Sequence, residues 1–267
     1  MNAVEGALLW AAVALYAASF VLALVGSIFH AGRAGRAGAA ALPSALALHL
    51  LAGVARWIAT GHAPVMDAYE NSLTGSWFVG VIFLALAWRI PAARAATPAV
   101  AAAVLLMLGN GLMTPARLGP LEPPFRSGWL VVHVTFAWLA FGSYVVAAIV
   151  GGLYLWHVRR AEADARRAGL LDDASGRLVA FGFAADTVMI ASGAIWAHGL
   201  WGRYWAWDPI ETWSLVSWLI YGVNLHLRFT LGWRGRRAAW LAVGSVVGIV
   251  VTFFGIQFVS DVHTELL

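Results

Sequence analysis

Long runs of hydrophobic residues alternate with short polar connections along the whole chain. A helix needs about 20 mostly apolar residues to span a bilayer. The runs that meet or approach this length predict eight transmembrane helices, at 7–30, 43–60, 72–90, 98–114, 129–157, 178–200, 210–230 and 237–259. The fourth run is short, and the fifth is long enough to extend beyond the bilayer. This pattern predicts an all-α integral membrane protein.

Composition supports this fold class and narrows it. The 267 residues are 61% hydrophobic and 11% charged, whereas soluble domains carry roughly 25% charged residues. The absence of cysteine excludes disulfides, thiolate metal sites and thiol redox chemistry of the chain's own. The first run has no basic n-region and no clear cleavage site, so it is expected to be a retained helix. We expect one polytopic membrane domain over 1–267, with no soluble domain or internal repeat.

The basic residues indicate how the spans are oriented. All 17 are arginines, and 13 of them lie in or near four alternate connections, 31–42, 88–97, 156–177 and 228–237. Basic residues in short loops point to a membrane topology signal and not to nucleic acid binding. The positive-inside rule places these four connections in the cytoplasm. Eight spans then place both termini on the outer side, together with the connections 61–71, 113–128 and 201–209.

With this orientation, four of the histidines fall into two pairs at similar depths in the membrane. His133, near the start of the fifth span, and His263, after the eighth, are both expected near the outer face. His49 in the second span and His226 near the end of the seventh are both expected in the inner third of the bilayer. Histidines within membranes are costly and usually functional, and paired imidazoles on separate helices commonly hold a haem iron.

Other interpretations of the histidines remain open. A single membrane histidine is often only a hydrogen-bonding link between helices. His198 is an alternative outer ligand, because it lies three residues before Trp201. His62 lies in an outer loop, and His30 and His157 are expected to be solvated interface residues.

The segment "WGRYWAWDPIETWS" (201–214) is the densest aromatic stretch of the chain. Its acids have a structural interpretation: Asp208 suits an N-cap, Pro209 the first helical position and Glu211 the third, much like a capping box. Tryptophans are also typical of an interfacial belt. A belt spreads over many helix ends, however, whereas five aromatic residues crowd this one stretch, namely Trp201, Tyr204, Trp205, Trp207 and Trp213.

A large planar ligand would explain this crowding. Aromatic side chains offer faces for stacking, Arg203 could pair with carboxylates on the ligand's edge, and the helix N-terminus adds N–H donors. A porphyrin has this shape, with a flat ring, two propionates and an iron that takes axial imidazoles. The stretch therefore predicts a haem site on the outer side, between His133 and His263.

These residues carry a family resemblance. "WGRYWAWDPIETWSLVSWLIYGVNLH" resembles the tryptophan-rich WWD motif of haem-handling proteins in cytochrome c biogenesis, most closely the CcsA/ResC type of system II. "RWIATGHAPVMDAYE" (56–70), "WLVVHVTFAWLAFGSY" (129–144) and a histidine after the last span agree with it. One departure is Ile210, where this family usually has lysine; Arg203 could take over the role of that cation.

The resemblance implies transport of haem to the outer face and its attachment to the CxxCH motif of apocytochrome c, as part of a holocytochrome c synthase complex. It implies a ResB/Ccs-type membrane partner and a thioredoxin-like reductant, in a bacterial inner membrane. The carried substrate would be haem b with two histidine ligands. The family's outer histidines match His133 and His263, and its inner one matches His226, whereas His49 rests on depth alone and the partner could replace it. The expected haem contacts span the motif: Trp201, Gly202, Arg203, Tyr204, Trp205, Trp207, Asp208, Pro209, Glu211 and Trp213.

Two other functions compete with this one. A b-type electron-transfer subunit would also hold two bis-histidine haems across a bilayer, but its haems would stay in place. A system I haem exporter of the CcmC type would have about six spans and would lack the "ETWS" continuation. Haem that leaves the protein during turnover would support the main hypothesis, whereas haem that stays bound would support the electron-transfer subunit.

Overall fold

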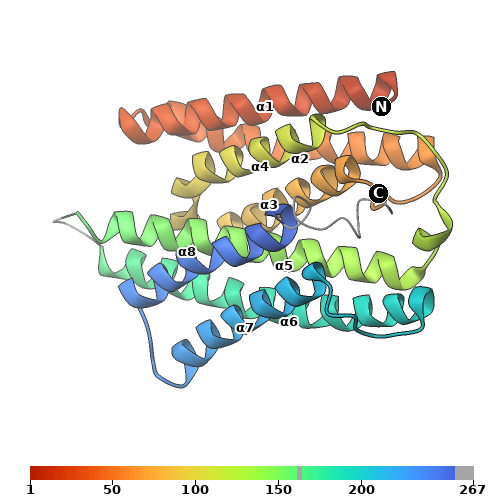
Figure 1. Cartoon of the computed structure of the whole chain (residues 1–267). Helices are drawn as coiled ribbons and strands as arrows, with labels where there is room; N and C mark the ends of the chain where they lie inside the picture. The colour runs from red at the N-terminus through yellow and green to blue at the C-terminus, as the bar shows by residue number, and fades with distance from the viewer. Residues whose placement is uncertain (161–163, 256–267) are drawn as a thin grey trace. The chain divides into compact units, whose positions relative to one another are not determined.

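The computed structural model describes residues 1–160 and 164–255, and within these residues every regular element is helical (Figure 1). The all-α prediction is therefore confirmed. Seven helical segments in the described part are long and apolar enough to cross a membrane. They are α1 (Ala3–Ile28), α2 (Gly32–Thr60), α3 (Ala68–Arg89), Pro91–Leu112, α5 (Gly128–His157), α6 (Ala165–Trp201) and Arg236–Phe253.

The remaining long helix is α7 (Pro209–Phe229), at the position of the seventh predicted span. Two of the seven segments are composite. Pro91–Leu112 joins the 3-10 helix η1 (Pro91–Ala96) to α4 (Thr97–Leu112), and α8 (Arg236–Val250) runs into a π-helical turn, η3 (Val251–Gly255). A short 3-10 helix, η2 (Pro123–Phe125), precedes α5.

The chain divides into two compact units, which are described separately. The first, Met1–Pro123, contains α1 to α4, with α1 packed on α2 and α4, and α3 packed on α4. The second begins at Pro124 and contains α5 to α8, with α5 packed on α6 and α8, and α7 packed on α6 and α8. The candidate site described below draws most of its residues from this second unit.

Two helices begin much earlier than their apolar runs. The run predicted at 43–60 belongs to α2, which begins at Gly32 and continues through Pro43. The run predicted at 178–200 belongs to α6, which begins at Ala165 after Asp164, whose side chain accepts from the Arg166 and Arg167 N–H groups. Hydropathy marks only the apolar part of a helix, whereas alanine and arginine sustain helical structure beyond it.

A buried ionic network ties together the ends of α1, α2 and α3 in the first unit. Arg56 is fully buried, and its guanidinium contacts Glu70 at 2.7 Å, Glu5 at 3.4 Å and Asp67 at 3.5 Å. It also donates to the Arg117 carbonyl at 2.6 Å. The remaining carboxylate oxygens accept from backbone N–H groups, and the Tyr69 hydroxyl donates to Glu5. We call the side chains of Glu5, Arg56, Asp67, Tyr69 and Glu70 the Arg56 cluster.

A second ionic network, in the second unit, holds the C-terminal end of α7 against the start of α6. Arg228 contacts Asp172 at 3.1 Å and Asp173 at 3.3 Å, both near the start of α6. Arg234 also pairs with Asp173, and the Gly235 N–H donates to Asp172. The end of α7 that carries His226 is therefore tied to α6 by charged contacts.

Candidate functional site

The aromatic stretch, residues 201–214, forms the connection between α6 and α7 and the first turns of α7. Gly202 ends α6 with a φ of 68°, a left-handed conformation that glycine adopts without strain. Asp208 is the N-cap of α7, because its carboxylate accepts from the Glu211 N–H at 2.8 Å, and Pro209 opens the helix. The predicted N-cap and first helical position are confirmed.

The Glu211 side chain has different partners from those of a capping box. Its Oε2 accepts from the Ala206 N–H at 2.6 Å and from the Trp207 N–H at 2.8 Å. Trp207 has a φ of 61°, which is uncommon for a bulky residue and costs about 1–3 kcal/mol. Glu211 thus holds the connection in a strained shape, and Trp207 is 69% exposed there.

Several aromatic side chains of the stretch are exposed at the protein surface. Trp201, Tyr204 and Trp213 are exposed, and Trp207 packs edge-on against Trp205 with centroids 5.8 Å apart. The Trp205 Nε1 is buried and has no hydrogen-bond partner among the described residues. A buried donor without an acceptor is rare and points to an acceptor supplied from outside the described residues.

Arg203 is exposed on the same connection. Within the described part of the chain, no hydrogen bond or ion pair engages its guanidinium. This cation is therefore available to a carboxylate of a ligand, as the sequence suggested.

His133 lies near the start of α5 and is oriented by α6. Its Nδ1 is 2.9 Å from the Met189 carbonyl oxygen. A carbonyl can only accept, so Nδ1 carries the hydrogen, and in the neutral ring Nε2 keeps its lone pair. Metal-binding histidines usually have their second nitrogen fixed in this way.

Trp196 connects His133 to the aromatic stretch, a role that sequence reasoning missed. Its ring stacks near His133 at 6.2 Å between centroids and lies 6.0 Å from the ring of Trp201. Its Nε1 donates to the Pro124 carbonyl at 3.1 Å. The available signal was the helical spacing of Met189, Gly193 and Trp196, which places all three on one face of α6.

Gly193 makes room for the imidazole. A Cβ at this position would lie 2.6 Å from the His133 Nδ1, closer than real Cβ atoms approach. The close packing of α5 on α6 at His133 therefore requires a glycine there.

His263 lies outside the described residues. The chain approaches it from α8 and the π-helical turn, where the Thr252 hydroxyl contacts Ser217 at 2.7 Å and the Trp213 carbonyl at 3.2 Å. The end of α8 therefore lies beside the aromatic stretch. His198, the alternative outer ligand, is exposed and stacks on Tyr204 with centroids 4.2 Å apart.

The two predicted inner histidines lie in different units, so their pairing stays a prediction. His226 is exposed on the last turns of α7, two residues before Arg228. His49 is buried in the first unit, where its Nδ1 is 3.1 Å from the Tyr16 hydroxyl. The other side of the buried His49 ring faces the Leu73 backbone, so its Nε2 is not clearly open to a ligand.

The remaining histidines differ from one another. His157 is buried, with Nε2 3.2 Å from the Asp164 carbonyl, so the prediction of a solvated residue was wrong for it: the N-cap residue of α6 packs against its ring. His30 is exposed, as predicted. His62 is buried, with Nδ1 2.8 Å from the Ala63 carbonyl and Nε2 3.2 Å from the Gly119 carbonyl, which leaves neither nitrogen for iron.

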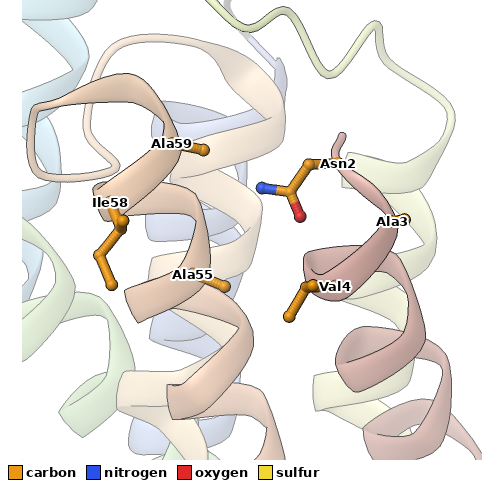
Figure 2. A pocket seen from close by; sticks show the side chains of 6 residues that line it. All are labelled: Asn2, Ala3, Val4, Ala55, Ile58 and Ala59. Atoms are coloured by element: carbon orange, nitrogen blue, oxygen red, sulfur yellow. The ribbon is translucent and has the colours of Figure 1, made fainter.

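A pocket in the first unit lies between the start of α1 and the end of α2 (Figure 2). Its walls are short or aliphatic side chains and one amide. They offer neither an imidazole nor an aromatic face, so the pocket does not suit a haem. The residues that line it are Asn2, Ala3, Val4, Ala55, Ile58 and Ala59.

Comparison with known proteins gives a consistent result. A family model described as "Cytochrome C assembly protein" matches residues 3–263. A "Cytochrome c biogenesis protein CcsA" of Synechococcus sp. (strain RCC307) is 32% identical, over 77% of this chain and 76% of the relative. The same-named protein of Parasynechococcus marenigrum (strain WH8102) is 33% identical, over 84% of this chain and 85% of the relative.

The chain also shares its fold with a solved structure. That structure is a "Cytochrome c Heme Lyase CcmF", with a TM-score of 0.70 and 19% identity, and the match covers 98% of this chain. The chain spans 50% of the length of that protein. At this identity the likeness supports the helical arrangement alone.

Proposed function

The chain belongs to the cytochrome c assembly family, as a multi-pass membrane protein of the CcsA type that acts in cytochrome c maturation, and on this premise we propose that it carries haem b to the outer face of the membrane and presents it to apocytochrome c. The single observation that carries the proposal is the geometry of His133. One of its nitrogens is fixed by a backbone carbonyl, its other nitrogen keeps a lone pair for iron, and Trp196 links it to the aromatic stretch.

At the outer site, His133 and His263 are the axial ligands of the iron. The exposed aromatic side chains Trp201, Tyr204, Trp207 and Trp213 provide faces for the porphyrin ring. Arg203 pairs with a propionate, and the unpartnered Trp205 N–H donates to a propionate oxygen. Gly202, Asp208, Pro209 and Glu211 give the connection its shape.

At the inner site, His226 is one ligand and His49 is the second. The burial of His49 in an apolar helix and the hydrogen bond that holds its Nδ1 to Tyr16 support this assignment. The alternative second ligand is a residue of the ResB/Ccs-type partner. Spectra of the chain with and without that partner distinguish the two.

Transfer to the apocytochrome requires no chemistry from this chain's side chains. The CxxCH histidine of the apocytochrome replaces one axial imidazole, and each thiol S–H adds across a haem vinyl group, which forms a C–S bond and places the hydrogen on the other vinyl carbon. The chain orients the haem edge and ligates the iron. Because it contains no cysteine, a thioredoxin-like protein must keep the apocytochrome thiols reduced. The expected setting is a bacterial inner membrane, with lipid around the spans.

The test uses the complex with its partner, purified as wild type and as His133→Ala, His263→Ala, His226→Ala and His49→Ala. Wild type should contain low-spin bis-histidine haem b that is lost on turnover with apocytochrome c. The outer variants should lose that spectrum and cytochrome c maturation together. Full haem and normal maturation in all four variants would overturn the proposal. Haem that stays in place during turnover would favour an electron-transfer subunit.

A further inference from the structure

The second unit buries an acidic residue that haem binding does not use. Asp186 is fully buried in α6, about 22 Å along the helix axis from the Trp201 end. It is the one charged residue of α6 between Arg177 and His198. Carboxyl groups at such depth are expensive and are usually retained for a function.

Two tyrosines from other helices complete the cluster. The Tyr144 hydroxyl, from α5, donates to the Asp186 Oδ2 at 3.2 Å. The ring of Tyr221, from α7, stacks on that of Tyr144 with centroids 3.3 Å apart and an angle of 4°. Both tyrosines are at most 1% exposed. We call Tyr144, Asp186 and Tyr221 the Asp186 cluster.

The Asp186 cluster leaves two buried polar atoms without a partner among the described residues, the Asp186 Oδ1 and the Tyr221 hydroxyl. Nearly all buried polar atoms in proteins are hydrogen-bonded, because leaving one unpaired forfeits its hydration. These two atoms therefore indicate a polar occupant.

Among the described residues of the second unit, no cation is paired with the carboxyl. On α5 the titratable group that contacts the carboxyl is Tyr144, and on α7 the nearest one is Tyr221, which stacks on Tyr144. The titratable residues of α8 are Arg236 and Arg237 at its start, and no ion pair in the described part of the chain includes Asp186. His133, the nearest histidine along α5, bonds the Met189 carbonyl one helical turn away from Asp186.

We propose that the Asp186 cluster is an intramembrane site that binds a proton and one water molecule. A carboxylate in this surrounding would lose its hydration with only the Tyr144 hydroxyl to compensate, so the group takes up a proton and becomes a neutral acid. A water between the free Asp186 oxygen and the Tyr221 hydroxyl satisfies both atoms. The site keeps the α5–α6 contact neutral beside the residues that orient His133, and it does not depend on haem being bound.

Infrared spectroscopy of the full-length protein in lipid tests the proton. Wild type labelled with ¹³C at the aspartate carboxyl should show the C=O band of a protonated aspartic acid at neutral pH, shifted by the label. Asp186→Asn should remove this band. The matched control Asp172→Asn should leave it unchanged, because Asp172 is ion-paired with Arg228. Absence of the band from labelled wild type, or its survival in Asp186→Asn, would overturn the proposal, and the first outcome needs no variant to fold.

Tyr221→Phe tests the water. If water bridges the two atoms, removing the hydroxyl breaks the bridge, shifts the aspartic acid band and lowers Tm by about 2–4 °C. If the hydroxyl has no partner, its deletion leaves the band in place and raises Tm or leaves it unchanged. Tyr144→Phe, which removes the direct hydrogen bond to Asp186, is the control that must shift the band in either case.

Discussion

The Arg56 cluster and the aromatic stretch both gather polar groups at helix ends, yet they are completed in different ways. In the Arg56 cluster, the guanidinium and all three carboxylates have partners within the chain. In the aromatic stretch, the Trp205 N–H has no acceptor, and Trp207 is exposed in a strained backbone conformation. The first region is closed to ligands, and the second has open positions.

This difference separates a structural role from a ligand-binding one. A buried charge is tolerated only when its partners compensate for its lost hydration, so removal of one partner destabilises the fold. Unpaired donors and backbone strain persist where a ligand completes them, which is why they cluster at functional sites. Variants in the first region should therefore change stability, and variants in the second should change haem binding.

Arg56→Met should have the largest effect. It leaves Glu5 and Glu70 fully buried without their cation, which should cost about 3–5 kcal/mol of unfolding free energy. Thermal unfolding in detergent measures this as a large fall in Tm. The matched variant Arg203→Met should keep the wild-type Tm and weaken haem retention. Equal falls in Tm for the two variants would erase the distinction between the regions.

Gly193→Val should disturb His133 directly. The added side chain meets the imidazole at its Nδ1, and overpacking of this kind costs about 1–3 kcal/mol, which corresponds to about 5- to 150-fold in haem affinity. Haem content per polypeptide measures the loss. Gly199→Val on the same helix is the control, because no atom lies within 4 Å of a Cβ there. Matching haem contents in the two variants would contradict the role given to Gly193.

Glu211→Ala should loosen the aromatic stretch. It leaves the Ala206 and Trp207 N–H groups without an acceptor, at a cost of about 1–3 kcal/mol. Haem should dissociate faster, as followed by transfer to apomyoglobin. Glu211→Gln keeps an oxygen acceptor and should restore most of the wild-type rate. If Gln behaves like Ala, the carboxylate charge and not the hydrogen bonds would be the important feature.

Asp208→Ala should have the smallest effect. It removes the N-cap of α7, which costs about 1 kcal/mol, while the bonds to Glu211 Oε2 stay in place. Calorimetry should show a small fall in Tm, and Asp208→Asn, which preserves the cap, should show almost none. A haem loss as large as that of Glu211→Ala would mean that Asp208 contacts the ligand.

Much of the fold was predictable because its signals are local. Apolar runs located the membrane-spanning helices, and the order Asp208, Pro209, Glu211 located the start of α7. The true start of α6 at Ala165 was missed, because the helix extends beyond its apolar part into a polar segment. The role of Trp196 and the hydrogen bonds of Glu211 were missed, because they depend on three-dimensional contacts that the pattern of apolar runs does not reveal. Asp186 was visible as an acid within an apolar run, but its tyrosine partners come from other helices.

The most direct test of the account is the absorption and electron paramagnetic resonance spectrum of ferric haem in the purified complex, compared between wild type and His133→Met. We expect bis-imidazole haem in wild type. In the variant we expect a changed axial ligation that reverts to bis-imidazole when free imidazole is added, with Tm nearly unchanged. A variant spectrum identical to that of wild type at full haem content would show that His133 is not an iron ligand and would contradict the outer-site assignment.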